Sequence, residues 1–223
     1  MRRIKYLSYP LQQNNPVYGK PDQPMTINPV KSIESGDSCN VYSFAMENHW
    51  GTHVDGPAHF FSNAPGIADY PAEFWLFSNP QVINIEVKAG QIISPVDLLE
   101  IVAETTDLLI LKTGWYKYRK NSCYCLENPG ISPELGTLLR KKRKNIRAIG
   151  FDFISLSSYV NRMIGRQAHQ VFLNPDSEGN PILIIEDMCL GADLKGLKEV
   201  WVAPLRLSSA DSSPCTVIGV FND

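Results

Sequence analysis

The histidines of this chain are concentrated in one short segment. Three of the four lie among twelve residues, which read Asn-His-Trp-Gly-Thr-His-Val-Asp-Gly-Pro-Ala-His from position 48. The segment therefore contains His49, His53 and His59 together with Asp55. Imidazole and carboxylate groups form the ligand set that zinc, manganese and iron(II) accept in proteins. Histidines used only for packing would be scattered, so the cluster favours a metal site over a histidine-rich loop without metal.

The spacing of these residues limits the shape of the backbone that carries them. In an extended strand, His49 and Asp55 would be separated by roughly 20 Å, and a metal ion with bonds of about 2 Å cannot bridge that distance. In a helix, His49 and His53 would be neighbours, but Asp55 would point elsewhere. Gly51 also disfavours a continuous helix. We therefore expect a bent, irregular segment that brings the ligands to one point.

His59 follows the turn expected at Gly56-Pro57. It is near enough in the chain to reach the same cavity without being a metal ligand. A free imidazole beside a metal-bound water is a good general acid or base near neutral pH. We therefore expect His59 to be the catalytic residue.

The same segment resembles the signature of a known enzyme family. The pattern H-x-G-T-H-x-D-x-P-x-H-F is present in full from His49 to Phe60. It resembles the signature of the cyclase-like metal-dependent hydrolases, which include bacterial kynurenine formamidase and isatin hydrolase. The resemblance is close at residues 48–60, moderate at 166–190 and loose at the N-terminus. It implies one α/β domain over residues 1–223, of the swivelling β/β/α type.

The resemblance also identifies candidates for the rest of the site. His169 and Glu186 are weak evidence by themselves, because a lone histidine is more often structural. In the family, a histidine on a downstream helix and a glutamate that ends an Ile-Ile-Glu strand complete the metal site, and here these are His169 and Glu186. Asp187 is the alternative to Glu186. Tyr18, in an early proline-rich loop, matches an aromatic residue of the family's substrate pocket, and a surface tyrosine is the open alternative.

The resemblance implies a centre with two divalent metal ions. The first ion is expected on His49, His53 and Asp55. The second is expected on Asp55 and His169, with Glu186 on one or both ions. Zinc is the first expectation and manganese the alternative, because imidazole and carboxylate suit both. A metal-held water with a pKa of about 7 would attack a carbonyl, and His59 would carry its proton to the leaving nitrogen.

These residues predict a metal-dependent amidohydrolase that acts on a small-molecule amide. By resemblance, the formamide of N-formylkynurenine is the leading substrate, as in tryptophan catabolism, and ring opening of a cyclic amide is the alternative. A metal-binding module without turnover is less favoured, because a structural site would not need a free base such as His59. A serine hydrolase is also disfavoured, because no G-x-S-x-G pattern is present.

Composition argues against several other classes of protein. With 43% hydrophobic and 20% charged residues, the chain suits one globular domain. A net charge of −2 gives no field to attract nucleic acid or an anionic membrane. No stretch approaches the ~20 apolar residues of a membrane span, and no apolar signal region follows the first charges. The basic run at residues 140–144 is interpreted as a solvated helix end.

The five cysteines show no paired metal-binding spacing. Reduced thiols in a cytoplasmic protein are the simplest expectation for such a set. The family resemblance implies a homodimer or a higher homo-oligomer, although the sequence does not show the interface.

Strand and helix patterns alternate along the chain and indicate a mixed α/β fold. Short apolar or alternating stretches predict strands at residues 40–47, 81–87, 107–112, 146–151, 181–185, 200–203 and 216–221. Residues 6–11 are a candidate edge strand. Ser-Pro pairs at 94–95 and 132–133 are typical of helix starts, so we expect helices over 94–104 and from 132 into the basic run. A third helix is expected over 162–173. Asp152 is expected to cap a loop, and a carboxylate that supports the metal ligands is the alternative.

Overall fold

A mixed β-sheet forms the centre of the molecule. The computed structural model describes residues 2–19 and 24–222. In this described part the main sheet has nine strands in the order β5-β12-β13-β4-β11-β10-β8-β6, with β1 also paired to β13. The strands are β1 (Arg2–Tyr6), β4 (His53–Asp55), β5 (Leu76–Phe77), β6 (Pro80–Asn84), β8 (Leu108–Lys112), β10 (Ala148–Phe151), β11 (Leu183–Glu186), β12 (Leu197–Pro204) and β13 (Ser212–Asn222).

Strand direction changes at β4, in the middle of the sheet. Strands β6, β8, β10 and β11 are parallel to one another. In contrast, β4 is antiparallel to both β11 and β13, and β12 is antiparallel to β13. The carboxyl end of β11 therefore lies beside the start of β4. This junction is where the candidate site residues of both strands meet.

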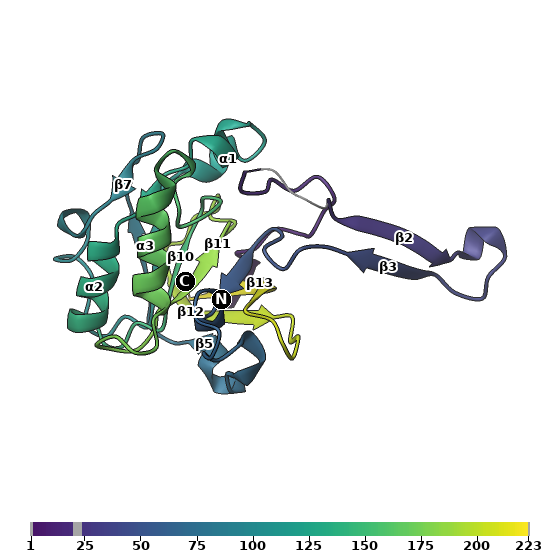
Figure 1. The fold of residues 1–223 in the computed structure, drawn as a ribbon. Helices are drawn as coiled ribbons and strands as arrows, with labels where there is room; N and C mark the ends of the chain where they lie inside the picture. The colour runs from purple at the N-terminus through teal and green to yellow at the C-terminus, as the bar shows by residue number, and fades with distance from the viewer. Residues whose placement is uncertain (1, 20–23, 223) are drawn as a thin grey trace.

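The parallel strands are buried on both faces, which explains why they read as continuous apolar runs. Leu109 and Leu111 of β8 pack in one hydrophobic cluster with helices α2 (Pro133–Lys142) and α3 (Arg162–Leu173). Leu108 and Ile110 of the same strand pack in a second cluster with β12 and β13. Figure 1 shows the two helices side by side over the sheet. The swivelling mixed α/β architecture predicted from the sequence is confirmed.

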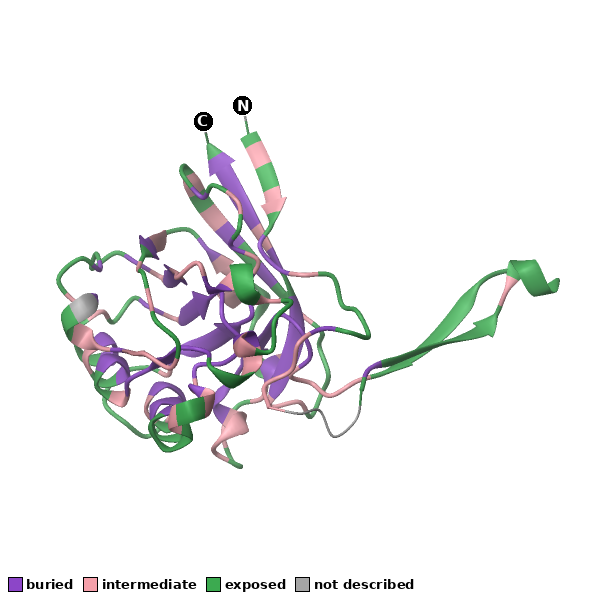
Figure 2. Ribbon diagram, turned by 90° about the horizontal axis from the view of Figure 1, so that it is seen from above, coloured by how far each residue is buried: buried purple, intermediate pink, exposed green. Residues whose placement is uncertain are grey.

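One short helix and four short strands lie outside the main sheet and its two longer helices. The short helix α1 spans Cys123–Leu126, and the two-residue strands β7 (Ile92–Ile93) and β9 (Gly130–Ile131) pair in parallel. Strands β2 (Thr26–Lys31) and β3 (Val41–Ala45) form a separate antiparallel hairpin. Figures 1 and 2 show this hairpin projecting far from the rest of the molecule, with exposed residues along its length. Within the described residues, no helix is long and apolar enough to cross a bilayer.

The helix predicted over residues 94–104 is wrong. Only a 3-10 turn at Pro95–Asp97 forms there, followed by further turns. Side chains from other elements bind the backbone groups that a longer helix would use. The Arg143 side chain donates to the carbonyls of Leu99 and Val102, and Gln81 bonds the backbone of the same stretch. Tertiary contacts therefore override the local helix signal.

The interpretation of residues 140–144 as a solvated helix end is also wrong for Arg140. This residue lies in α2 but is buried, and its guanidinium donates to the carbonyls of Val171, Asn174, Ser177 and Gly179. It joins the end of α2 to the end of α3 and the loop that follows. The edge strand also differs from the prediction, because it spans Arg2–Tyr6 and not residues 6–11.

Asp152 behaves as the loop cap predicted for it. Its carboxylate accepts hydrogen bonds from the backbone amides of Thr113 and Gly114 and from the Thr113 hydroxyl. These bonds hold the end of β8 against the end of β10. Asp152 therefore acts in loop structure.

Candidate metal centre

Strand β4 places two candidate ligands side by side. His53 and Asp55 are two residues apart in this strand, so their side chains project from the same face. The register with β11 sets Glu186 directly beside His53. The His53 Nε2 atom lies 3.3 Å from Glu186 Oε2 and 3.6 Å from Asp55 Oδ1. Sheet pairing thus brings together residues that are far apart in the sequence.

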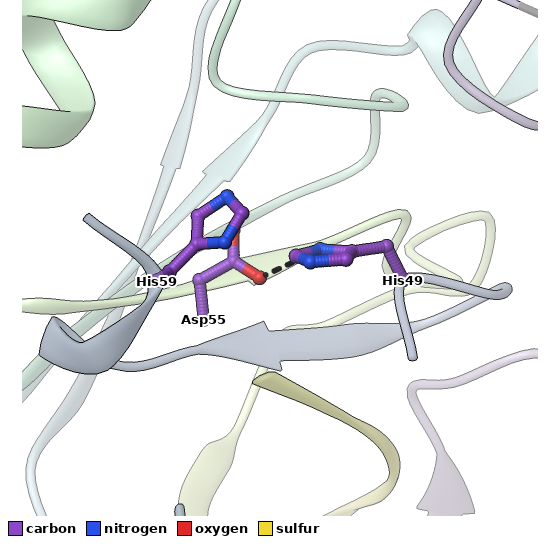
Figure 3. Close-up of side chains that lie close together, drawn as sticks. All are labelled: His49, Asp55 and His59. Atoms are coloured by element: carbon purple, nitrogen blue, oxygen red, sulfur yellow. Dashed lines mark ion pairs between the residues drawn. The ribbon is translucent and has the colours of Figure 1, made fainter. Parts of the chain in front are cut away.

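A glycine turn brings His49 back toward the same carboxylate. Gly51 has a φ of 66°, in the left-handed region that favours glycine. The chain therefore bends between His49 and β4, and His49 Nδ1 lies 3.2 Å from Asp55 Oδ1. Figure 3 shows this contact as a dashed line, with His59 close to both side chains. The bend agrees with the predicted shape, although residues 53–55 form a regular strand.

Helix α3 contributes the last candidate ligand. The Nε2 atom of His169 lies 3.6 Å from Glu186 Oε1 and 3.8 Å from Asp55 Oδ2. Its Nδ1 lies 2.9 Å from the Gly165 carbonyl, which can only accept, so Nδ1 carries the proton and Nε2 presents a lone pair to the carboxylates. The structure therefore brings together the five residues that the sequence analysis selected as metal ligands.

Two buried atoms in this cluster have no hydrogen-bond partner: His53 Nε2 and Asp55 Oδ1. His53 Nδ1 is 2.8 Å from the Gly51 carbonyl, so it donates there and leaves a lone pair on Nε2. A lone pair facing carboxylate oxygens in a buried site is unfavourable without a positive charge between them. The residues present therefore fit a divalent cation, since ligand carboxylates must be ionised and ligand imidazoles neutral.

The electrostatics of the cluster favour positive charge. Burial opposes the charged form of His49, but the carboxylates of Asp55 and Asp211 outweigh it and raise the pKa of His49 to about 10. Burial also opposes the charged form of His169, but the carboxylates of Glu186 and Asp55 outweigh it and raise the pKa of His169. Burial opposes ionisation of Asp55, but the surrounding imidazoles hold the pKa of this carboxyl well below its usual range.

His59 and Asp211 form a pair at the edge of the cluster. His59 Nδ1 lies 2.8 Å from Asp211 Oδ2, so Nδ1 donates to the carboxylate and Nε2 is left for another partner. Asn48 Nδ2 donates to the other oxygen of Asp211 at 2.7 Å. The Asp211 carboxylate also lies 3.7 Å from His49 Nε2. The sequence analysis missed Asp211, because an aspartate in a serine-rich loop gives no local signal.

Asp187, the alternative to Glu186, is bonded elsewhere. Its carboxylate receives hydrogen bonds from the Arg119 guanidinium and from the Tyr124 hydroxyl. Its carbonyl accepts from the Thr52 hydroxyl at 2.6 Å. It is the one non-glycine residue with positive φ among the described residues, at 51°. Asp187 therefore fixes the chain beside Glu186 and, through Thr52, beside His53.

A cavity of about 480 Å³ opens onto the cluster. Its wall includes Tyr18 and Phe60, and the Phe60 ring stacks on the His169 ring with centroids 5.2 Å apart. Arg162 and Arg166 of α3 also line it. Another groove of about 500 Å³ lies at the root of the β2–β3 hairpin, but its lining contains no histidine and no carboxylate. The cavity at the cluster is therefore the one suited to chemistry.

Known proteins similar to this chain include hydrolases that align over nearly its full length. A kynurenine formamidase from Bacillus anthracis is 28% identical over 221 residues, covering 98% of both chains. One from Bacillus thuringiensis subsp. konkukian is 29% identical over 215 residues, covering 95% of this chain and 94% of the relative.

Solved structures show the same fold. Isatin hydrolase A from Labrenzia aggregata, bound to benzyl benzoate, has a TM-score of 0.78 at 20% identity, with 100% of this chain and 94% of that one covered. Isatin hydrolase A from Ralstonia solanacearum has a TM-score of 0.79 at 17% identity, with coverages of 99% and 92%. The model of the family described as Putative cyclase matches residues 6–158. Together with the relatives that align end to end, this match shows that the chain is a hydrolase of the cyclase family.

Proposed function

We propose that this chain is a metal-dependent hydrolase that cleaves an aryl formamide, with N-formylkynurenine as the leading substrate. The observation that carries the metal is the pair of buried, unpartnered atoms on His53 and Asp55 among three imidazoles and two carboxylates. The observation that supports the formamide is the end-to-end alignment with relatives named kynurenine formamidase. The assignment of the substrate rests on those relatives.

The two oxygens of Asp55 support a division of the ligands between two ions. Oδ1 faces His49 and His53, whereas Oδ2 faces His169. We assign one ion to the first group and a second to His169 with Glu186, with Asp55 shared. Zinc is preferred for its affinity for imidazole, and manganese is the alternative. Cations held by these residues would supply a nucleophilic water at neutral pH and would polarise a carbonyl.

The proton transfers are assigned to His59. Asp211 accepts the Nδ1 proton of His59, so Nε2 is the atom that can take a proton from the attacking water. The same atom then gives the proton to the leaving nitrogen, which must be protonated as the amide bond breaks. Asp211 also stabilises the imidazolium that forms between these two steps.

The position of His59 leaves a competing role to be tested. Its ring lies close enough to His49 and Asp55 to join them around an ion. The hydrogen bond to Asp211 favours the acid/base role, because it orients the ring without using Nε2.

The test of the function is turnover on a matched panel of substrates. Purified protein, loaded with zinc or manganese, is offered N-formylkynurenine and a set of cyclic amides. Chelator-sensitive release of formate is the expected result. Ring opening of a cyclic amide without formamide cleavage would make the cyclic amide the substrate and would leave the proposed mechanism unchanged. Bound metal without turnover on any substrate would contradict the enzyme proposal and favour a metal-binding module.

We propose further that the β2–β3 hairpin joins two copies of the chain. Tyr42 and Phe44 of β3 are 60% and 59% exposed, and no other strand of the described chain pairs with the hairpin. A hairpin that stands alone is only marginally stable in water. Phe44 also lines the apolar groove at the hairpin root, together with Leu11 and Leu205. A second copy supplies both a hairpin and a groove, so a two-fold arrangement satisfies both surfaces at once.

Light scattering after size exclusion tests this assembly. Wild-type protein is expected at twice the mass of the chain, and a Tyr42→Glu/Phe44→Glu variant at the mass of one chain. Val160→Glu is the control, because Val160 is also exposed but lies outside the hairpin. A monomeric wild type would overturn the proposal.

The five cysteines are all free thiols, which supports the proposed cytoplasmic location.

A further inference from the structure

One helix carries both a candidate metal ligand and two cations along the same cavity. Arg162, Arg166 and His169 are spaced at i, i+4 and i+7 in α3, so they project from one face of the helix. All three line the cavity at the cluster. With a rise of about 1.5 Å per residue, Arg166 is displaced along the helix axis by about 4.5 Å from His169 and Arg162 by about 10 Å. The face runs from the metal cluster toward solvent.

Neither of these two guanidinium groups forms an ion pair with another residue that the structure describes. The ion pairs of arginine within residues 2–19 and 24–222 involve Arg2, Arg119 and Arg147. Arg162 instead lies over the ring of Tyr159, with 3.9 Å between its central carbon and the ring centroid. This stacking restrains the side chain and leaves its in-plane N–H groups free. Guanidinium groups of this kind bind carboxylates through paired hydrogen bonds.

Aromatic side chains lie between the cluster and the arginines. Phe60 stacks on His169 at the inner end of the cavity. Tyr18 lines the cavity and meets Tyr159 edge to face, with ring centroids 5.6 Å apart. Along the helix, the lining therefore passes from the metal cluster and aromatic surface to two cations, and it also includes the carboxylate of Glu47. This order corresponds to a molecule with an amide at one end, an aromatic ring in its middle and an acid at the other end.

We propose that Arg162 and Arg166 bind a carboxylate of the substrate, so that the enzyme selects aryl formamides that carry an acidic group. The inference rests on the proposed hydrolase function and narrows it to one substrate class. N-formylkynurenine belongs to this class, because its amino acid carboxylate is remote from its formamide. Neutral formamides and neutral cyclic amides have no carboxylate for the arginines to bind, so the arginines do not increase their affinity.

Turnover of an acidic and a neutral formamide by the same variants tests this proposal. N-formylkynurenine and formanilide share the scissile bond and the ring, but only the first has a carboxylate. Arg162→Gln, Arg166→Gln and the double variant are compared with wild type. We expect kcat/KM for N-formylkynurenine to fall about 10- to 100-fold in the double variant, mainly through KM, which corresponds to about 1.4–2.7 kcal/mol of lost binding. The kcat/KM for formanilide is expected to remain at the wild-type value.

Two controls separate recognition from structure. Gln167→Ala changes an exposed residue of the same helix that does not line the cavity, and both substrates should be cleaved as by wild type. Arg166→Lys keeps the charge and should restore part of the loss seen in Arg166→Gln.

Three outcomes would overturn the assignment, and they can be told apart. Equal losses on both substrates would show that the arginines support the fold or the metal cluster. No loss on either substrate would show that the carboxylate is bound elsewhere or not at all. In both cases the hydrolase function would stand, because wild type still cleaves formanilide. Wild-type protein that cleaves neither formamide would refute the proposed function itself, and this inference with it.

Discussion

At the scale of single residues, mutation can test whether His59 acts as the acid and base or belongs with the candidate metal ligands. His59→Ala should keep the bound metal and lower kcat by at least ~100-fold, because it removes a positioned acid and base. Metal content and turnover are measured on the same sample. Lost metal together with lost activity would make His59 a ligand. Activity retained at the wild-type level would contradict any catalytic role.

A substitution at Asp211 should lower kcat by less than a substitution at His59. Asp211→Asn keeps an acceptor for His59 Nδ1 but removes the charge that stabilises the imidazolium. We expect kcat to fall by about 10-fold, a loss smaller than that for His59→Ala. Ser209→Asn is the control, because it changes an exposed residue of the same loop. Full activity in Asp211→Asn would show that the pair has no part in proton transfer.

By itself, the sequence could point to candidate site residues only where a signal was concentrated. His49, His53, Asp55 and His59 lie in one segment, so their density alone indicated a metal site. His169 and Glu186 required the family resemblance, because each is isolated in the chain. Asp211 gave no signal. It reaches His59 because β13 pairs with β4 in a register that sets Ser212 beside Asp55, and that register is a property of the whole sheet.

At the scale of elements, the close packing of α3 against Ser157 depends on a glycine. A Cβ on Gly165 would lie 2.2 Å from Ser157 Oγ and 2.4 Å from Ser157 Cα. Gly165→Ala must therefore push α3 outward and displace His169, whose Nδ1 bonds the Gly165 carbonyl. We expect a loss of about 1–3 kcal/mol in the free energy of unfolding and weaker metal binding. Urea denaturation and metal titration measure these.

Gln167→Ala is the matched control for the glycine. Gln167 is an exposed residue of the same helix, and alanine has a high helix propensity. The variant should be as stable as wild type and bind metal as well. If Gly165→Ala behaved in the same way, the close packing of α3 on Ser157 would not matter for the site.

The loop after β11 depends on a buried ion pair. Arg119 donates to both oxygens of Asp187, which is fully buried. Arg119→Met leaves that carboxylate with Tyr124 as its remaining side-chain partner, and unpairing a buried charge costs about 3–5 kcal/mol. Chemical denaturation of metal-free protein should show this loss. Arg206→Met changes an exposed arginine that makes a long, 3.4 Å hydrogen bond to the Ala68 carbonyl, so stability should change little. Equal stability of the two variants would show that the Arg119–Asp187 pair does not hold this loop.

Most strands could be predicted, whereas the helix over 94–104 and the exposure of Arg140 were predicted wrongly. The strands at 107–112 and 146–151 are short apolar runs, and burial on both faces leaves no other arrangement for them. The stretch at 94–104 has a good helix start, but Gln81 and Arg143 bind its backbone from other elements. Arg140 is buried against the carbonyls at the end of α3. A local sequence pattern does not reveal such long-range partners.

At the scale of the whole molecule, metal binding should stabilise the fold. The candidate ligands come from β4, β11, α3 and the segment before β4, so an ion joins both halves of the sheet to a helix. Ligand linkage predicts about 4 kcal/mol of added stability when free metal exceeds its Kd by about 1,000-fold. Thermal denaturation with and without chelator measures it. We expect residues 1–223 to unfold as one domain, in a single transition that chelator moves to lower temperature.

The chelator effect has an internal control. Asp55→Asn removes the carboxylate that we assign to both ions, so the denaturation midpoint of this variant should not respond to chelator. A wild type that is equally insensitive would contradict the linkage.

The general architecture followed from the alternation of strands and helices together with the family resemblance. The projecting hairpin did not, although residues 40–47 were correctly predicted to include a strand. Local patterning shows that a segment is extended but not which strand it pairs with. The exposed apolar residues of the hairpin become informative only once the structure shows that the main sheet does not cover them.

Metal content per chain is the most direct test of the proposed two-ion centre. Wild-type protein and Asp55→Asn are reconstituted with zinc, dialysed and counted by mass spectrometry of the metal. The account predicts two ions on each wild-type chain, in keeping with a two-metal hydrolase site, and loss of both in Asp55→Asn. Wild-type protein without metal after reconstitution, or a variant that retains the full wild-type content, would contradict it.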